Sequence, residues 1–158
     1  LSQITDINTG TLKTIRRLSM QISARNQISG IVELIEHGKI NAQVFIKLKS
    51  GNTLVSVITN TAANNLNLEI GDDVVAIFKS STVLITTDMA LNISARNKFY
   101  GIVDSINQDE INTELVIDIG NSEKIASIIT SSSAERLKIE KGSQVSAIIK
   151  ASDVIIGK

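Results

Sequence analysis

The chain has 158 residues, of which 42% are apolar and only 3% aromatic, and its 16 basic and 16 acidic residues give a formal net charge of zero. This length allows one medium domain or two small ones, and the aliphatic composition favours strands over helices. The lack of a basic excess argues against a DNA-binding surface on this segment, and the lack of cysteine excludes disulfides and thiolate metal sites.

The first twenty residues differ in pattern from the rest of the chain. Leu12, Ile15 and Leu18 have helical spacing, which predicts a short amphipathic helix over residues 11–18. The chain begins at Leu1 rather than at a methionine. We therefore expect residues 1–20 to be a linker helix from a missing N-terminal domain.

An internal repeat dominates the remaining sequence. The tetrapeptide Ser-Ala-Arg-Asn at residues 23–26 recurs 71 residues later, at residues 94–97. The same offset holds without a gap to the end of the chain, with 26 identities in the 66 pairs that run from Ile22/Ile93 to Thr87/Lys158. This pattern indicates a duplication and predicts two domains, residues 21–88 and 89–158.

Within each copy, short apolar runs alternate with turn residues, which predicts strands. In the first copy the predicted strands cover residues 30–36, 42–49, 54–59, 74–79 and 83–86, and in the second 101–106, 124–130, 145–150 and 154–156. One helical turn per copy fits residues 62–66 and 134–137. We expect the last strand of each copy to close its own unit, giving an all-β chain of two tandem, five-stranded OB-like barrels.

The tetrapeptide carries the strongest candidate side chains for binding. Arg25 and Arg96 each precede a glycine predicted to start a strand, and a guanidinium offers a fixed fork of donors that matches an oxyanion. Ser23 and Ser94 lie two residues earlier, on the same face of an extended segment. The alternative is that the tetrapeptide is only a folding feature of a turn.

The asparagine that ends each tetrapeptide is interpreted differently. We expect Asn26 and Asn97 to be structural and to satisfy backbone groups at a bend.

Two further pairs of residues recur at the ends of predicted strands. Lys79 and Lys150 each end an apolar run, where the alternative is an edge lysine that protects the strand end. Thr59 and Thr130 each end another strand, where the alternative is an ordinary helix N-cap. Taken together, the three pairs supply hydrogen-bond donors, which a desolvated dianion requires. Such a set partly disfavours phosphate, whose remaining proton needs an acceptor.

Enzymatic signatures are missing from the sequence. It contains no phosphate loop, no nucleotide-binding glycine pattern and no nucleophile elbow. The single histidine, His37, falls in a predicted turn. We therefore expect a binding protein that is not an enzyme and has no cofactor.

The repeated pattern resembles a known family. Ser-Ala-Arg-Asn followed by Gly-Ile-Val, Ile-Thr, a Leu-rich segment before Gly71 and a strand that ends in Lys79 is similar to the Mop domain (Mop/TOBE type) of molybdate-binding proteins. Two copies resemble the tandem, di-Mop arrangement, over residues 20–158. The resemblance implies that molybdate or tungstate is held through its oxygens, with no metal ion bound directly to the protein.

The resemblance also implies where the oxyanion binds. Such sites lie at subunit interfaces, with the serine and arginine from one chain and the lysine from another. The positions that match are Ser23, Ala24, Arg25, Thr59, Lys79 and Ser80 in the first copy, and Ser94, Ala95, Arg96, Thr130, Ser133 and Lys150 in the second. Ala62 replaces a family serine in the first copy and Ala151 replaces a hydroxyl residue in the second, so the two sites are not expected to be identical.

At the level of the whole protein, the resemblance implies the ligand-sensing half of a molybdate-responsive transcriptional regulator. Such a protein is a cytoplasmic homodimer or higher homo-oligomer that contacts DNA only through the missing N-terminal domain and does not contact a membrane. The alternatives are a molbindin that stores molybdate and an accessory domain of a molybdate transport ATPase. A nucleic-acid-binding OB barrel is a further alternative, which the low aromatic content disfavours.

Overall fold

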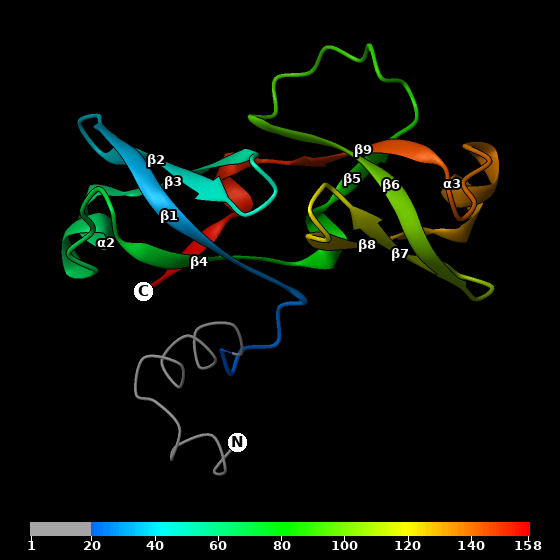
Figure 1. Cartoon of the computed structure of the whole chain (residues 1–158), viewed down its shortest axis with the longest axis horizontal. Helices are drawn as coiled ribbons and strands as arrows, with labels where there is room; N and C mark the ends of the chain where they lie inside the picture. The colour runs from blue at the N-terminus through cyan, green and yellow to red at the C-terminus, as the bar shows by residue number, and fades with distance from the viewer. Residues whose placement is uncertain (1–19) are drawn as a thin grey trace.

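The computed structural model describes residues 20–158 and consists of two β-barrel-like units side by side along the long axis of the molecule (Figure 1). Of the predicted linker, only Met20 belongs to the described residues, so the predicted helix over residues 11–18 lies outside them. Within the described part of the chain, no helix is long and apolar enough to cross a membrane.

Each repeat contributes five strands and one short α-helix. The first repeat comprises β1 (Asn26–His37), β2 (Asn41–Leu48), β3 (Thr53–Thr59), α2 (Asn60–Asn65), β4 (Asp73–Phe78), the 3₁₀ turn η2 (Ser80–Thr82) and β5 (Leu84–Thr86). The second comprises β6 (Asn97–Gln108), β7 (Asn112–Asp118), β8 (Lys124–Thr130), α3 (Ser131–Arg136), β9 (Gln144–Ile149), η3 (Ala151–Asp153) and β10 (Ile155–Gly157). The predicted all-β architecture of two five-stranded units is confirmed.

The first strand of each repeat is longer than predicted. Gly30 and Gly101 lie inside β1 and β6 rather than at their starts, because the strands begin four residues earlier, at the tetrapeptide asparagines. Gly30 sits where β1 passes from pairing with β4 to pairing with β2. A β-carbon built on Gly30 would lie 2.7 Å from the carbonyl oxygen of Lys47, so this crossing requires glycine.

The helical turns also begin earlier than predicted. The side chains of Thr59 and Thr130 cap α2 and α3 by accepting hydrogen bonds from the backbone N–H groups of Ala62 and Ser133, at 3.0 and 3.1 Å. The helices therefore start directly after these threonines. The N-cap interpretation of both residues is confirmed.

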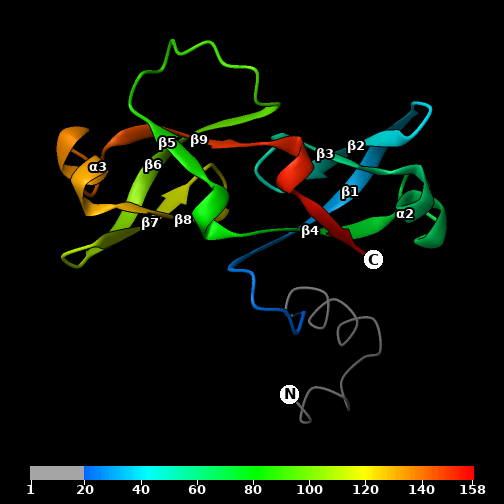
Figure 2. The same cartoon turned by 180° about the vertical axis from the view of Figure 1, so that it is seen from behind.

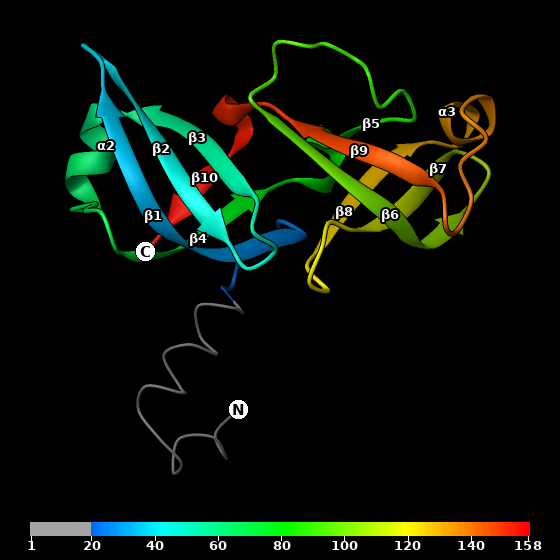
Figure 3. The same ribbon diagram turned by 45° about the horizontal axis from the view of Figure 1, so that its top comes forward.

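The last strand of each repeat does not close its own unit. The two sheets have the strand orders β10-β4-β1-β2-β3 and β5-β9-β6-β7-β8, so the repeats exchange their final strands. The exchange is visible in Figure 3, where β10 lies beside β4, and in the reverse view of Figure 2, where β5 lies beside β9. The expectation of self-contained units is wrong. The edges of β4 and β9 are equivalent in the two repeats, so each can pair with the last strand of either repeat.

Buried contacts accompany the exchange on both sides. The fully buried hydroxyl group of Ser56 donates to the carbonyl oxygen of Val154 at 2.7 Å, and Ser127 makes the equivalent bond to Val83. Buried aliphatic residues of both repeats form one continuous hydrophobic cluster. The two repeats therefore share a core as well as strands.

Candidate functional site

The ends of paired strands bring the candidate cations together. In the first repeat Asn26 pairs with Phe78, so Arg25 and Lys79 are the next residues at the end of this antiparallel pair. In the second repeat Asn97 pairs with Ile149, which places Arg96 beside Lys150 in the same way. Neighbouring strands lie about 5 Å apart, so each repeat carries two basic residues next to each other at one corner of its sheet.

A pocket of about 420 Å³ surrounds the cations of the first repeat. Its walls include five residues predicted for the first site: Ser23, Ala24, Arg25, Lys79 and Ser80. Ile128, Asp153 and Ile155 of the second repeat also line it. The pocket therefore lies between the two repeats, and the strand exchange positions its second wall.

The two lysines are available to a ligand. Both are exposed and both directly precede a 3₁₀ turn, η2 after Lys79 and η3 after Lys150. Among the residues that the structure describes, neither lysine has an ion-pair partner. An unpaired ammonium group at a pocket rim can bind an anion with little rearrangement.

The two arginines have partners, and each partner belongs to the other repeat. Arg25 forms a bidentate ion pair with Glu114 on β7, with N–O distances of 2.8 and 3.0 Å. Arg96 donates to the amide oxygen of Gln43 on β2 and lies 6.0 Å from the centre of the Phe45 ring. The hydrogen bond to Arg25 lowers the pKa of the Glu114 carboxyl, and the same contact raises the pKa of Arg25.

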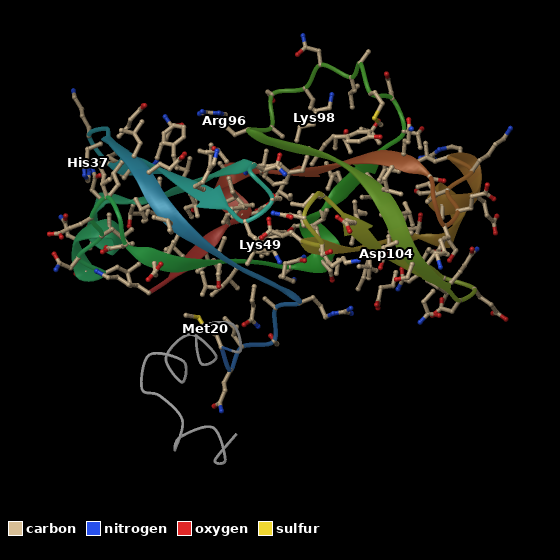
Figure 4. All side chains as sticks on the ribbon, viewed as in Figure 1. Met20, His37, Lys49, Arg96, Lys98 and Asp104 are labelled. Atoms are coloured by element: carbon tan, nitrogen blue, oxygen red, sulfur yellow. The ribbon has the colours of Figure 1, made fainter. Side chains whose placement is uncertain are left out.

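Within each repeat, the threonine lies at the end of the sheet opposite to the arginine. Thr59 is paired with Asn41 at the end of β1 and β2 that is opposite to Arg25. Its neighbour Asn60 contacts His37 at 2.9 Å, and Figure 4 shows His37 at the outer end of the first repeat and Arg96 near the middle of the molecule. Thr130 and Ser133 occupy the equivalent outer end of the second repeat.

One repeat therefore assembles only part of each predicted site. The tetrapeptide and the lysine come together, whereas Thr59, Thr130 and Ser133 lie at the outer ends. The resemblance implies that the lysine comes from another chain, and in this structure Lys79 already lines the same pocket as Arg25. How residues of different chains combine stays a prediction.

Several residues near the site were missed by sequence reasoning. Gln43, Glu114 and Asp153 fall within ordinary strand or turn segments, and nothing in the sequence links them to the tetrapeptide. Glu114 and Asp153 add acceptors to a site that was predicted to contain donors only. Discrimination against phosphate therefore cannot rest on a donor-only lining.

A second pocket, of about 470 Å³, lies on the second repeat away from the predicted residues. Its walls include Tyr100, Ile102 and the carboxylates of Asp104 and Asp118. Lys124 forms ion pairs with both carboxylates, at 3.0 and 3.6 Å. This pocket contains none of the predicted residues, whereas five of them line the pocket at Arg25 and Lys79, so that corner remains the candidate site.

Solved structures and curated proteins resemble this chain over most of its length. The crystal structure of the cytoplasmic molybdate-binding protein ModG with molybdate bound has a TM-score of 0.84 and 38% sequence identity, and the match covers 87% of this chain and 99% of that one. The molybdenum transport protein ModE of Azotobacter vinelandii is 34% identical over 98% of this chain and 58% of its own length. The molybdenum-pterin-binding protein MopA of Rhodobacter capsulatus is 36% identical over 92% of this chain and 55% of its own length.

The chain thus spans a little more than half the length of these two curated relatives. The sequence pattern of the TOBE domain matches it twice, over residues 22–85 and 93–156. Both matches coincide with the repeats seen in the structure. The chain belongs to the TOBE-domain family and contains two tandem copies of that domain.

Proposed function

We propose that the chain binds a tetrahedral oxyanion, molybdate or tungstate, without catalysing a reaction. The first set of residues is Ser23, Arg25 and Lys79, and the second is Ser94, Arg96 and Lys150. One observation carries the proposal: each repeat places an arginine and a lysine without an ion-pair partner among the described residues at adjacent positions of a strand pair, and in the first repeat they line a pocket of about 420 Å³. Two cations at one corner match the charge of a dianion.

The relatives support the choice of ligand. ModG is described as a molybdate-binding protein, and ModE and MopA carry molybdenum in their names. The likeness to ModG extends over the whole ModG chain, which includes both repeats. ModG is also described as cytoplasmic, which supports the same location for this chain.

We infer that the complete site lies between copies of the chain. Within each repeat the threonine lies at the end of the sheet opposite to the arginine, so one repeat does not bring the two groups to one ligand. A second copy that places its outer end against the tetrapeptide of the first would supply the missing hydroxyl groups. An oxyanion bound in this way stabilises the assembled homo-oligomer by mass action.

At the level of the whole protein, we propose the ligand-sensing part of a molybdate-dependent transcriptional regulator, which contacts DNA through a separate domain. The match to ModE over 98% of this chain and 58% of ModE supports this assignment. A storage molbindin is the second candidate, because the match covers 99% of the ModG chain. DNA binding that depends on molybdate in the full-length protein would support the regulator, and its absence would support the molbindin.

Calorimetric titration tests the proposed ligand. We expect molybdate and tungstate to release binding heat, and sulfate and phosphate to bind more weakly. Lys79→Ala and Lys150→Ala should each remove or weaken one class of sites, and the double variant should remove both. Lys39→Ala, at an exposed position in the β1–β2 turn, is the control. Equal molybdate affinity in the wild type and the double variant would contradict the site.

A further inference from the structure

The two arginine partners occupy equivalent positions of the two repeats. Gln43 on β2 and Glu114 on β7 are separated by the repeat offset of 71 residues. Each reaches across to the tetrapeptide of the other repeat: Glu114 binds Arg25, and Gln43 binds Arg96. The structure therefore holds both arginines in the same way but uses an acid for one and an amide for the other.

This difference changes the charge that a ligand meets. Glu114 places two carboxylate oxygens on Nη1 and Nη2 of Arg25, which fills one edge of the guanidinium and offsets its charge. Gln43 gives Arg96 one neutral acceptor, and the face of Phe45 lies 6.0 Å away. Val116 takes the position of Phe45 in the second repeat, so Arg25 has no equivalent aromatic neighbour. Arg96 thus keeps its full positive charge for an anion.

The contact with Glu114 is open to competition. The side chains of Arg25 and Glu114 are 47% and 34% exposed, and exposed ion pairs are weak enough for a ligand to displace. Arg25 also keeps Glu114 ionised, because their hydrogen bond lowers the pKa of that carboxyl. A dianion that approaches Arg25 must therefore displace, or bind beside, a negative charge.

We infer that Glu114 makes the two oxyanion sites unequal: it competes with the ligand for Arg25, so that the Arg96 site fills first and the Arg25 site fills at higher ligand concentration. This inference rests on the proposed function. Glu114 sets the relative affinity of the two sites by acting through Arg25, and Gln43 is its neutral counterpart.

The expected effect is a fold-change in affinity at one site only. A unit charge a few ångströms from a dianion, in a setting close to water, changes the dissociation constant by roughly tenfold. Because the groups are exposed, added salt should reduce this difference. A purely structural effect of Glu114 would not depend on salt in this way.

The experiment isolates each site in the full chain. Arg96→Ala leaves the Arg25 site, and Arg25→Ala leaves the Arg96 site. Molybdate titrations of these two proteins should show roughly tenfold weaker binding at the Arg25 site. Glu114→Gln in the Arg96→Ala background should restore most of this loss. Gln43→Glu in the Arg25→Ala background should introduce a loss of the same size.

Controls separate charge competition from folding. An amide at position 114 should be tolerated, because Gln43 already fills the equivalent position, and thermal unfolding checks this. Glu140→Gln removes one negative charge at an exposed position of the α3–β9 turn and should leave both affinities unchanged.

Each outcome decides a different question. Equal affinities at the two isolated sites, or a Glu114→Gln variant that binds as its parent does, would overturn the inference and leave the proposed function standing. No molybdate heat in any variant, including the wild type, would overturn both. Weaker binding at the Arg25 site that Glu114→Gln relieves at low salt supports the inference.

Discussion

The side-chain amide of Asn97 binds the backbone of Val55 through both of its polar atoms. Its Oδ1 accepts from the Val55 N–H and its Nδ2 donates to the Val55 carbonyl oxygen, each at 2.8 Å. Asn26 holds Ala126 in the same way, at 2.8 and 2.9 Å. Both asparagines are almost fully buried, so the last residue of each tetrapeptide ties its own repeat to the third strand of the other.

Replacement of Asn97 by alanine should destabilise the fold. It leaves the N–H and carbonyl group of Val55 without partners in a buried place, which costs about 1–3 kcal/mol per unsatisfied group. Urea unfolding of Asn97→Ala should show a lower midpoint with an unchanged slope. Asn92→Ala, at an exposed loop position, is the control and should match the wild type. A loss below about 0.5 kcal/mol for Asn97→Ala would show that the two hydrogen bonds between Asn97 and Val55 do not contribute to stability.

Gly101→Ala should be among the most damaging small substitutions. The added methyl group would lie 2.5 Å from the carbonyl oxygen of Asp118 and 2.6 Å from a methyl group of Ile117. The first of these neighbours is backbone, so β6 and β7 must separate, at a cost of about 1–3 kcal/mol. Thermal unfolding measures this loss. A variant as stable as the wild type would mean that the strands can separate there without loss of pairing.

Lys138→Asn should stabilise the chain. Lys138 follows the end of α3 with a φ of 55°, in the left-handed region that glycine and asparagine tolerate best. The equivalent residue after α2 is Asn67, with a φ of 50°. We expect Lys138→Asn to gain roughly 0.5–1 kcal/mol and Asn67→Lys to lose a similar amount, measured by chemical unfolding. Changes of the same sign in both variants would contradict this explanation.

The β6–β7 hairpin should contribute a pH-dependent part of the stability. The Asp109 carboxylate accepts hydrogen bonds from the backbone N–H groups of Ile111 and Asn112, each at 2.8 Å, and these bonds lower its pKa below the usual value. Because the folded-state pKa is the lower one, this contribution is present above the unfolded-state pKa, about 4, and is lost as the pH falls through the folded-state value.

An NMR titration of the carboxyl carbon measures the Asp109 pKa directly. The difference in unfolding free energy between the wild type and Asp109→Asn should be larger at pH 7 than at pH 3. The β1–β2 turn, where Gly38 takes the equivalent position, offers an internal comparison without a carboxylate. An Asp109 pKa at or above the usual value would refute the assignment.

Much of the fold follows from local pattern. The alternation of residues 42–49 predicts a strand with Val44, Ile46 and Leu48 on its inner face, and all three are buried in β2. The predicted strand at residues 124–130 coincides with β8. Such elements are predictable because their periodicity reflects which face meets the core.

The exchange of β5 and β10 could not be predicted in this way. The two final strands are similar in sequence, so either would fit either sheet, and the outcome depends on how the whole chain packs. The starts of β1 and β6 were missed because polar side chains such as Asn26 and Gln27 hide the strand pattern. Each arginine contacts a residue of the other repeat, 89 residues away in the chain for Arg25 and 53 residues away for Arg96. Local sequence patterns do not predict contacts over such separations.

The crossed strands have a consequence for any attempt to divide the molecule. A cut in the segment between β5 and β6 yields two halves, and each half carries the strand that the other needs and lacks the one that would finish its own sheet. In the intact chain β10 covers the edge of β4 and β5 covers the edge of β9, so a mixture of the two halves can rebuild both sheets. The duplicated chain is therefore a candidate for a split protein whose two pieces reassemble by exchanging their last strands.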